Sequence, residues 1–477
     1  MTDDARPPVV HAPCGDIRGF YEQLPGADGA RIVRAAGIPY ATAGRFEPPV
    51  PLDSLAGQSP YPGYAPIAPG EVFEATRFSP MCPQNEDAAI TAMVGVQRRD
   101  LGMSEDCLRL TVSAPADREP GEALPVMVWI HGGSYVSGAG DSSVSDPVLI
   151  VGEQRVVLVT VTYRLGLFGY LARTHSPANL GLIDQAAAFT WVRRNIAAFG
   201  GDPGRVTAFG ESAGADSIAH LMAAMGAGGE LLFDRAILLS PPLGIRRGRA
   251  RMSAVMSRLA SAKLSEGASM MEVLTLQEEV GRAVAFWGLP GMMPFGTEYG
   301  HAPLPPEHEV ERAWAAVAPR VPLLAVSVGT ETTFFAHTMP AAQRLRALPA
   351  VGEGAYWRLN AALSDRVFTK AITRFAEDHA RAGGEAHRAY IPFSVPGNPI
   401  ASPHAIDVSL MSAREDTWHE VEAFRGATWD EVEAAGRDLR RYLADFARGS
   451  GRNEGERGML TKHPRAIRGH RVLAQAR

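Results

Sequence analysis

The sequence has few cysteines and no long uninterrupted apolar run. Its 477 residues include three cysteines, too few for the disulfide framework of a small secreted domain. The most apolar long segment, residues 156–171, is interrupted by Arg164 and is too short to span a bilayer. The N-terminus lacks the basic and apolar regions of a signal peptide, and there is no N-glycosylation sequon. We therefore expect a cytoplasmic protein with no membrane segment.

An excess of positive charge is absent as well. The formal net charge is −5, and no basic stretch alternates with aromatic residues, which argues against nucleic acid as a partner. No internal repeat, long linker or charge block divides the chain. We therefore expect one domain over residues 1–477, with helical and loop insertions around 245–320 and 340–385. Residues 449–477 carry seven Lys and Arg against two Glu, and we expect them to form a loose basic tail.

Apolar runs of strand length alternate with helical patterns along most of the chain. Continuous apolar strands of this kind are typical of a parallel sheet that helices cover on both faces. The expected strands are 125–130, 156–163, 206–209, 236–239, 323–328 and 386–393, and the expected helices are 184–198, 216–225, 251–282, 365–382 and 429–448. The pattern predicts an α/β fold with a mostly parallel central sheet.

Residues 210–214 read G-x-S-x-G, with Ser212 at the centre. A predicted strand precedes the motif and a predicted helix follows it. A sharp turn from strand to helix exposes a serine hydroxyl above the sheet, and glycines are needed where a Cβ atom would clash. Ser212 is therefore a candidate nucleophile. A plain turn serine remains the alternative, because the motif is short.

A serine hydroxyl needs a base, and the base needs a buried carboxylate that holds one tautomer. Catalytic groups of a parallel sheet follow the carboxyl ends of strands. Glu331 follows the strand expected at 323–328, and His404 lies in the loop after 386–393. The resulting chain order of serine, acid and histidine is typical of this class of hydrolase. His419 remains a competing base, and Glu331 could also be a solvated acid.

An oxyanion hole requires backbone N–H groups from two places. Ala213 follows the candidate nucleophile directly. Gly133 and Ser134 lie in a glycine-rich loop after the strand expected at 125–130. Their N–H groups are candidate donors, although a simple glycine turn is the alternative.

At this point the sequence resembles the type-B carboxylesterases, the cholinesterase-like branch of the α/β-hydrolase fold, over roughly residues 9–450. The resemblance is carried by blocks at 37–41 (GIPYA), 104–108 (SEDCL), 129–133 (WIHGG), 163–166 (YRLG), 181–185 (GLIDQ), 199–203 (FGGDP) and 210–215 (GESAGA). One departure is Ser134, which stands where the family often has a third glycine. A backbone N–H donor survives that change.

The resemblance implies a central, mostly parallel twisted sheet with helices on both faces and a small N-terminal sheet. It implies a catalytic triad of Ser212, Glu331 and His404, and an oxyanion hole of Gly133, Ser134 and Ala213. It implies no metal and no cofactor. It also implies a disulfide between Cys82 and Cys107, which a reducing cytosol would leave open.

We therefore expect a serine carboxylic-ester hydrolase that acts on a small-molecule ester through an acyl-enzyme. Cholinesterase relatives have a tryptophan about ten residues before the second cysteine of the pair, and Gln97 stands there in this chain. We accordingly expect neutral, small-to-medium esters as substrates. An amidase or carbamate hydrolase with the same triad is one alternative. A non-catalytic, cholinesterase-like binding module is another.

Overall fold

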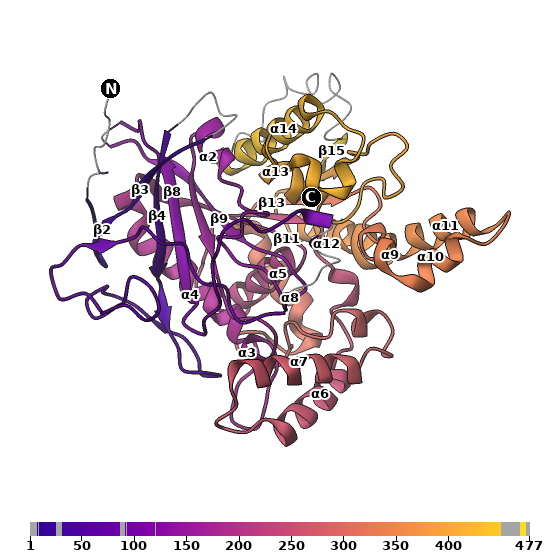
Figure 1. Cartoon of the computed structure of the whole chain (residues 1–477), viewed down its shortest axis with the longest axis horizontal. Helices are drawn as coiled ribbons and strands as arrows, with labels where there is room; N and C mark the ends of the chain where they lie inside the picture. Colours follow the sequence, from indigo (N-terminus) through magenta and orange to yellow (C-terminus); the bar gives the residue numbers. More distant parts are fainter. Residues whose placement is uncertain are drawn as a thin grey trace.

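The computed structural model describes residues 7, 9–24, 31–85, 91, 93–119, 121–449 and 468–473. Among these residues, ten strands form one large sheet that runs through the molecule (Figure 1). From one edge to the other, the strands are β15 (Arg468–Leu473), β14 (Ala386–Ile391), β13 (Leu323–Val328), β12 (Arg235–Leu239), β11 (Gly201–Glu211), β9 (Leu124–Ile130), β10 (Val157–Val161), β8 (Arg109–Pro115), β4 (Arg31–Pro39) and β3 (Phe20–Gln23).

The central part of this sheet is parallel. Strands β14, β13, β12, β11, β9 and β10 pair in parallel, whereas β8, β4 and β3 on one side and β15 on the other pair antiparallel. A separate small sheet joins β1 (Val10–Ala12), β2 (Gly15–Arg18) and β7 (Phe73–Glu74), and β5 (Ala41–Thr42) pairs with β6 (Val50–Pro51). The predicted central sheet and small N-terminal sheet are both confirmed.

Helices cover the sheet on both faces, because successive side chains of a buried strand point to opposite sides. In β9, Val126, Val128 and Ile130 belong to one apolar core, while Met127 and Trp129 belong to the other. The first core contains residues of α4 (Leu180–Asn195), α5 (Ala213–Gly226), α8 (Val310–Val317) and α12 (Lys370–Arg381). The second contains residues of α2 (Leu149–Gln154), α13 (Ile406–Ser412) and α14 (Trp429–Arg448).

Two expected helices differ in detail. The segment 251–282 divides into α6 (Ala250–Lys263) and α7 (Met270–Ala283), because a capping box of Ser269 and Glu272 starts a new helix. The segment 365–382 begins with one π-helical turn, Asp365–Thr369, which continues from α11 (Gly352–Ser364) into α12. Helices α10 (Pro340–Arg346) and α11 extend away from the sheet in Figure 1.

Part of the expected C-terminal tail is ordered. Gly449 ends α14 in a left-handed conformation, and residues 468–473 form β15, which pairs with β14 and is the edge strand of the sheet. The rest of that segment lies outside the described residues. None of the helices in the described part of the chain combines the length and the apolarity that crossing a membrane requires.

The strand order reverses direction at β9. The chain passes from β9 to β10 on one side and then crosses back to β11 on the other. In sheets of this kind, ligands bind at such a reversal, beyond the carboxyl ends of the strands. The loops that follow β9 and β11 meet there, and they carry the predicted oxyanion loop and the predicted nucleophile.

Candidate active site

Ser212 occupies the sharp turn between β11 and α5. Its φ and ψ angles are 53° and −121°, a conformation that a residue with a side chain rarely adopts. The turn is held by the Ser212 N–H group, which donates to the carbonyl of Leu239 at 2.9 Å. A Cβ atom on Gly214 would lie 2.0 Å from the carbonyl oxygen of Ile130, and one on Gly210 would lie 2.7 Å from the same atom. Both motif glycines are therefore required by the close approach of β9.

Ser212, His404 and Glu331 form a continuous line of hydrogen bonds. The Ser212 hydroxyl donates to His404 Nε2 at 2.8 Å, and His404 Nδ1 donates to Glu331 Oε2 at 2.7 Å. Glu331 follows β13 and His404 follows β14, as the sequence predicted. Ser212 is 7% exposed, His404 4% and Glu331 0%. The carboxylate fixes the Nδ1–H tautomer, which leaves Nε2 free to accept the serine proton.

Two further donors hold Glu331 in place. Ser240 Oγ donates to Glu331 Oε1 at 2.7 Å, and the N–H group of Val328 donates to the same oxygen at 3.1 Å. With His404 on the other oxygen, both carboxylate oxygens are occupied. The buried acid is therefore fixed in the orientation that the imidazole needs.

Two further acids, Glu211 and Asp407, lie near the imidazole of His404. Glu211 Oε1 lies 3.1 Å from His404 Nε2, and Asp407, in the first turn of α13, is fully buried. Burial raises the pKa of Glu211 to about 8, and burial together with the charge of Glu331 raises the pKa of Asp407 to about 7. Burial lowers the pKa of His404, but Glu211, then Glu331 and Asp407, outweigh it and raise that pKa to about 9. A protonated imidazole is thus strongly stabilised at this position.

The loop that carries Gly133 and Ser134 approaches the nucleophile at Gly132, and Ala213 follows Ser212 directly. A Cβ atom on Gly132 would lie 3.2 Å from the Ser212 Cβ atom, so the loop after β9 touches the serine turn. Among the described residues, no hydrogen bond uses the backbone N–H group of Gly133 or Ser134. Ala213 begins α5, so its N–H group has no partner within the helix. In the described part of the chain, the three predicted donors therefore have no assigned hydrogen-bond acceptor, and their role as an oxyanion hole stays a prediction.

The competing base, His419, lies in a solvent-exposed setting. His419 is exposed in a short 3₁₀ helix, Trp418–Glu420, and is not part of the triad. Aromatic side chains instead surround His404: the ring centroids of Phe368, Phe335 and Phe334 lie 4.7, 5.7 and 5.9 Å from its own. An apolar wall of this kind limits access of water to the base.

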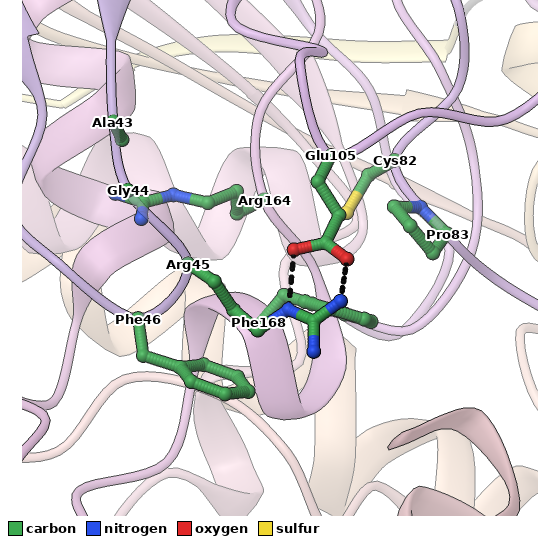
Figure 2. A pocket seen from close by; sticks show the side chains of 9 residues that line it. All are labelled: Ala43, Gly44, Arg45, Phe46, Cys82, Pro83, Glu105, Arg164 and Phe168. Carbon is green, nitrogen blue, oxygen red and sulfur yellow. Dashed lines mark hydrogen bonds and ion pairs between the residues drawn. The ribbon is translucent and has the colours of Figure 1, made fainter. Parts of the chain in front are cut away.

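Cys82 and Cys107 are both buried, and both are free thiols, as is Cys14. The neighbouring Cys82, together with burial, raises the pKa of the Cys107 thiol well above its usual range. The implied disulfide is not formed in this structure, and its formation stays a prediction. Cys82 also lines a small cavity of about 10 Å³ in which Arg45 and Glu105 face each other (Figure 2).

Three residues of the site, Glu211, Asp407 and Ser240, were not identified from the sequence. Glu211 stands inside the G-x-S-x-G motif, and its place beside the nucleophile could have identified it. Asp407 lies in the first turn of α13, just after the loop that carries His404. Ser240 follows β12 directly, at the carboxyl edge where the site was expected. Among the described residues, no group of three or more His, Cys, Asp or Glu side chains is arranged to hold a metal ion.

Comparisons with known proteins agree with this geometry. The sequence pattern of the Carboxylesterase family matches residues 6–349. A probable N-octanoylanthranilate hydrolase from Rhodococcus erythropolis is 34% identical over 415 residues, which cover 86% of this chain and 87% of that protein. The para-nitrobenzyl esterase of Bacillus subtilis (strain 168) is 42% identical over 224 residues, which cover 46% of this chain and 42% of that protein.

A solved structure of a PNB esterase shares the fold. It superposes with a TM-score of 0.71 at 27% sequence identity, covering 92% of this chain and 90% of that chain. The sequence blocks, the strand order and the place of Ser212 at the end of β11 lead to one assignment. This chain belongs to the carboxylesterase family, with the α/β-hydrolase fold of the type-B carboxylesterases, and is a carboxylic-ester hydrolase.

Proposed function

We propose that the protein cleaves esters through a Ser212–His404–Glu331 triad and a covalent acyl-enzyme. The observation that supports this most directly is the pair of hydrogen bonds, 2.8 and 2.7 Å long, that joins the three side chains. Ser212 Oγ attacks the ester carbonyl while His404 Nε2 takes its proton. The carbonyl oxygen becomes an anion, which the N–H groups of Gly133, Ser134 and Ala213 stabilise.

The two halves of the reaction use the same groups in turn. His404 gives its proton to the departing alcohol oxygen as the ester C–O bond breaks, which leaves the acyl group on Ser212. A water molecule then attacks the acyl carbon, and His404 takes the proton of that water. Collapse of the second tetrahedral intermediate releases the carboxylic acid and returns the proton to Ser212. Glu331 stabilises the imidazolium in both steps.

Covalent labelling tests the nucleophile. A fluorophosphonate probe should label the wild-type protein at Ser212, and the Ser212→Ala variant should not be labelled. Replacing Ser212 or His404 by Ala should each lower kcat for p-nitrophenyl acetate by roughly 10⁴-fold or more. The double variant should be little worse, because the two residues act as a unit. Near-additive losses would identify a different base, and His419→Ala would then be the next variant to measure.

We further propose that the substrate is a neutral, small-to-medium ester. The three aromatic side chains next to the base, Phe334, Phe335 and Phe368, are apolar and carry no charge. The segment between Cys82 and Cys107 contains no tryptophan. Stacking of a quaternary ammonium group on an indole contributes about 2 kcal/mol or more when it is desolvated, so its absence should disfavour choline esters.

Two esters with the same acyl group test this preference. The value of kcat/KM for butyrylcholine should be at least about tenfold below that for an uncharged butyrate ester whose leaving group has a similar pKa. A preference for the choline ester would show that one of the phenylalanines near His404 binds the cation. Either result requires that Ser212→Ala abolishes turnover of both esters.

Amide hydrolysis is the second candidate. It is favoured by the likeness to the probable N-octanoylanthranilate hydrolase, whose name denotes an acyl group on nitrogen. Comparison of p-nitrophenyl octanoate with the matching octanoyl anilide separates the two, because both carry the same acyl chain. A kcat/KM for the anilide equal to or above that of the ester would favour the amidase.

A protein that neither reacts with the fluorophosphonate nor turns over any ester would be a binding module.

A further inference from the structure

The loop after β9 has an unusual backbone at three consecutive residues. Gly133, Ser134 and Tyr135 have φ angles of 105°, 54° and 63°. A residue with a Cβ atom loses roughly 1 kcal/mol or more in this left-handed region, because the Cβ atom crowds the following carbonyl. Ser134 and Tyr135 can keep this shape only while contacts from outside the loop hold it.

Tyr135 makes those contacts. Its side chain is fully buried, and its ring centroid lies 4.4 Å from that of Tyr170. Its hydroxyl donates to Asp216 Oδ2 at 2.6 Å and accepts a weaker hydrogen bond from Ser217 Oγ at 3.3 Å. Its carbonyl accepts from the N–H group of Gly166 at 2.7 Å. Within the part of the chain that the structure describes, the Tyr135 hydroxyl forms both side-chain hydrogen bonds between loop 132–138 and α5.

Asp216 is fixed relative to the nucleophile. It lies in the first turn of α5, and its N–H group donates to the carbonyl of Ser212 at 2.9 Å. Its carboxylate is fully buried, and the guanidinium Nε of Arg246 lies 3.6 Å from Oδ2, so a positive charge stabilises it. A hydrogen bond to an ionised acceptor is about twice as strong as a neutral one. Burial, reinforced by the charge of Asp216, raises the pKa of Tyr135 well above its usual range and keeps the donated proton on the phenol.

We propose that the Tyr135–Asp216 hydrogen bond positions the oxyanion hole. It joins the loop that supplies the Gly133 and Ser134 donors to the helix that supplies the Ala213 donor. The inference rests on the proposed ester hydrolysis at Ser212. Tyr135 and Asp216 are positioning residues, since they act through the backbone that they hold. Donors must stay within about 0.5 Å of the productive geometry to stabilise the transition state.

The Tyr135→Phe variant tests the proposal, because it keeps the ring and removes the hydroxyl. We expect kcat for p-nitrophenyl acetate to fall about 10- to 100-fold with KM changed less than about threefold, since the donors meet a full charge only in the transition state. A trifluoromethyl ketone forms the same kind of oxyanion when Ser212 Oγ adds to its carbonyl and the proton passes to His404. Its affinity should fall by the same factor as kcat/KM.

The partner residue gives a second, independent variant. Asp216→Asn keeps an acceptor but removes the charge, so its loss of kcat should be smaller than that of Tyr135→Phe. The double variant should be no worse than Tyr135→Phe alone, because one hydrogen bond is lost in both.

A matched control separates positioning from stability. Tyr40 is also fully buried, and its hydroxyl donates to the carbonyl of Thr162 at 2.8 Å. Tyr40→Phe removes one buried hydrogen bond that joins neither the loop nor α5. It should lower Tm to a similar extent as Tyr135→Phe while leaving kcat within about twofold of the wild type.

The outcomes are distinct. Wild-type turnover that survives Ser212→Ala would overturn the proposed function itself. Turnover that depends on Ser212, together with a Tyr135→Phe variant that matches Tyr40→Phe in kcat and in ketone affinity, would overturn only this inference and leave Tyr135 a packing residue. If Tyr135→Phe does not fold, unchanged kcat and ketone affinity in Asp216→Ala, which removes the acceptor, would overturn it as well.

Discussion

His404 can act as a base only in its neutral form, and its surroundings favour the protonated form. Glu211 has the largest raising effect on the His404 pKa, which lies at about 9. Below that pKa the imidazole holds a proton and cannot accept one from Ser212. The value of kcat/KM should therefore fall as the pH decreases through this pKa, above the range of an ordinary histidine.

The Glu211→Gln variant should move this limb of the pH profile. Without the charge of Glu211, the pKa of His404 decreases, and the limb should shift to lower pH by about 1 pH unit or more. Asp407→Asn serves as the comparison, and its smaller effect on His404 predicts a smaller shift in the same direction. The measurement is kcat/KM against pH for one ester. A limb that stays in place or moves to higher pH in Glu211→Gln would contradict this assignment.

The residues that sequence reasoning identified share one property. Ser212, Glu331 and His404 each follow a strand whose apolar composition is visible in the sequence, so their place at one edge of the sheet could be predicted. The effects of Glu211 and Asp407 on the pKa of His404 could not be predicted, because they depend on how far the carboxyl groups lie from the imidazole in the folded chain. The phenylalanines near His404 were missed for the same reason.

At the level of the elements, two helices begin with the same capping box. Ser269 caps α7 with Glu272, and Thr428 caps α14 with Glu431, each with reciprocal side-chain and backbone hydrogen bonds. Removal of such a cap costs about 1 kcal/mol. We expect Ser269→Ala and Thr428→Ala each to lower the free energy of unfolding by about that amount, measured by urea denaturation, without changing kcat.

The control for these caps lies in the interior of α7. Thr275 is exposed, and its hydroxyl donates to the carbonyl of Met271 four residues earlier. Alanine is the better helix former at such a position, so Thr275→Ala should change stability by less than about 0.5 kcal/mol. Equal losses for Thr275→Ala and Thr428→Ala would show that the cap makes no special contribution.

The ends of a helix could be predicted where a capping residue or a glycine lies next to them in the sequence. The range 429–448 for α14 agrees with the structure, because Thr428 and Gly449 mark its two ends. The capping box at Ser269 was present in the sequence but not used, so α6 and α7 were merged. The π-helical turn at Asp365–Thr369 has no such local signal. It adds one residue to a helical turn, and helical periodicity over a short window does not resolve that addition.

Across the whole molecule, one buried ion pair joins distant parts of the chain. Arg440 of α14 donates through Nε and Nη2 to the two oxygens of Glu153 in α2, both at 2.7 Å, and through Nη1 to the carbonyls of Leu410 and Met411. The two side chains are 3% and 5% exposed and 287 residues apart. The pair fastens the three helices of one face to one another.

Arg440→Ala should lower the free energy of unfolding by about 3–5 kcal/mol, because Glu153 would remain buried without its partner. Arg437 provides the control on the same helix. It pairs with Glu433 one turn away and is 43% exposed, so Arg437→Ala should cost less than about 1 kcal/mol. Replacing both Arg440 and Glu153 by Met should be less harmful than Arg440→Ala. Equal effects of Arg440→Ala and Arg437→Ala in denaturant titrations would contradict this role.

The strand order was the part of the architecture that residue patterns alone did not specify. Apolar runs show that strands exist, but the run at Val157–Val161 is equally compatible with either side of β9. The side of β9 on which this strand pairs depends on how the helices cover the two faces of the sheet. That arrangement involves the whole chain. The resemblance supplied the overall fold, and the structure shows that β10 and β11 flank β9.

In the proposed mechanism, the position of His404 in the chain also sets when the protein can first act. His404 lies 192 residues after Ser212. A ribosome that adds 5–20 residues per second would need roughly 10–40 s to synthesise the base after the nucleophile. A nascent chain therefore carries its serine turn for most of that time without a general base or a fixed tautomer. Esters in the surrounding cell meet an inert serine until the last parallel strand, β14, and the loop after it have been made.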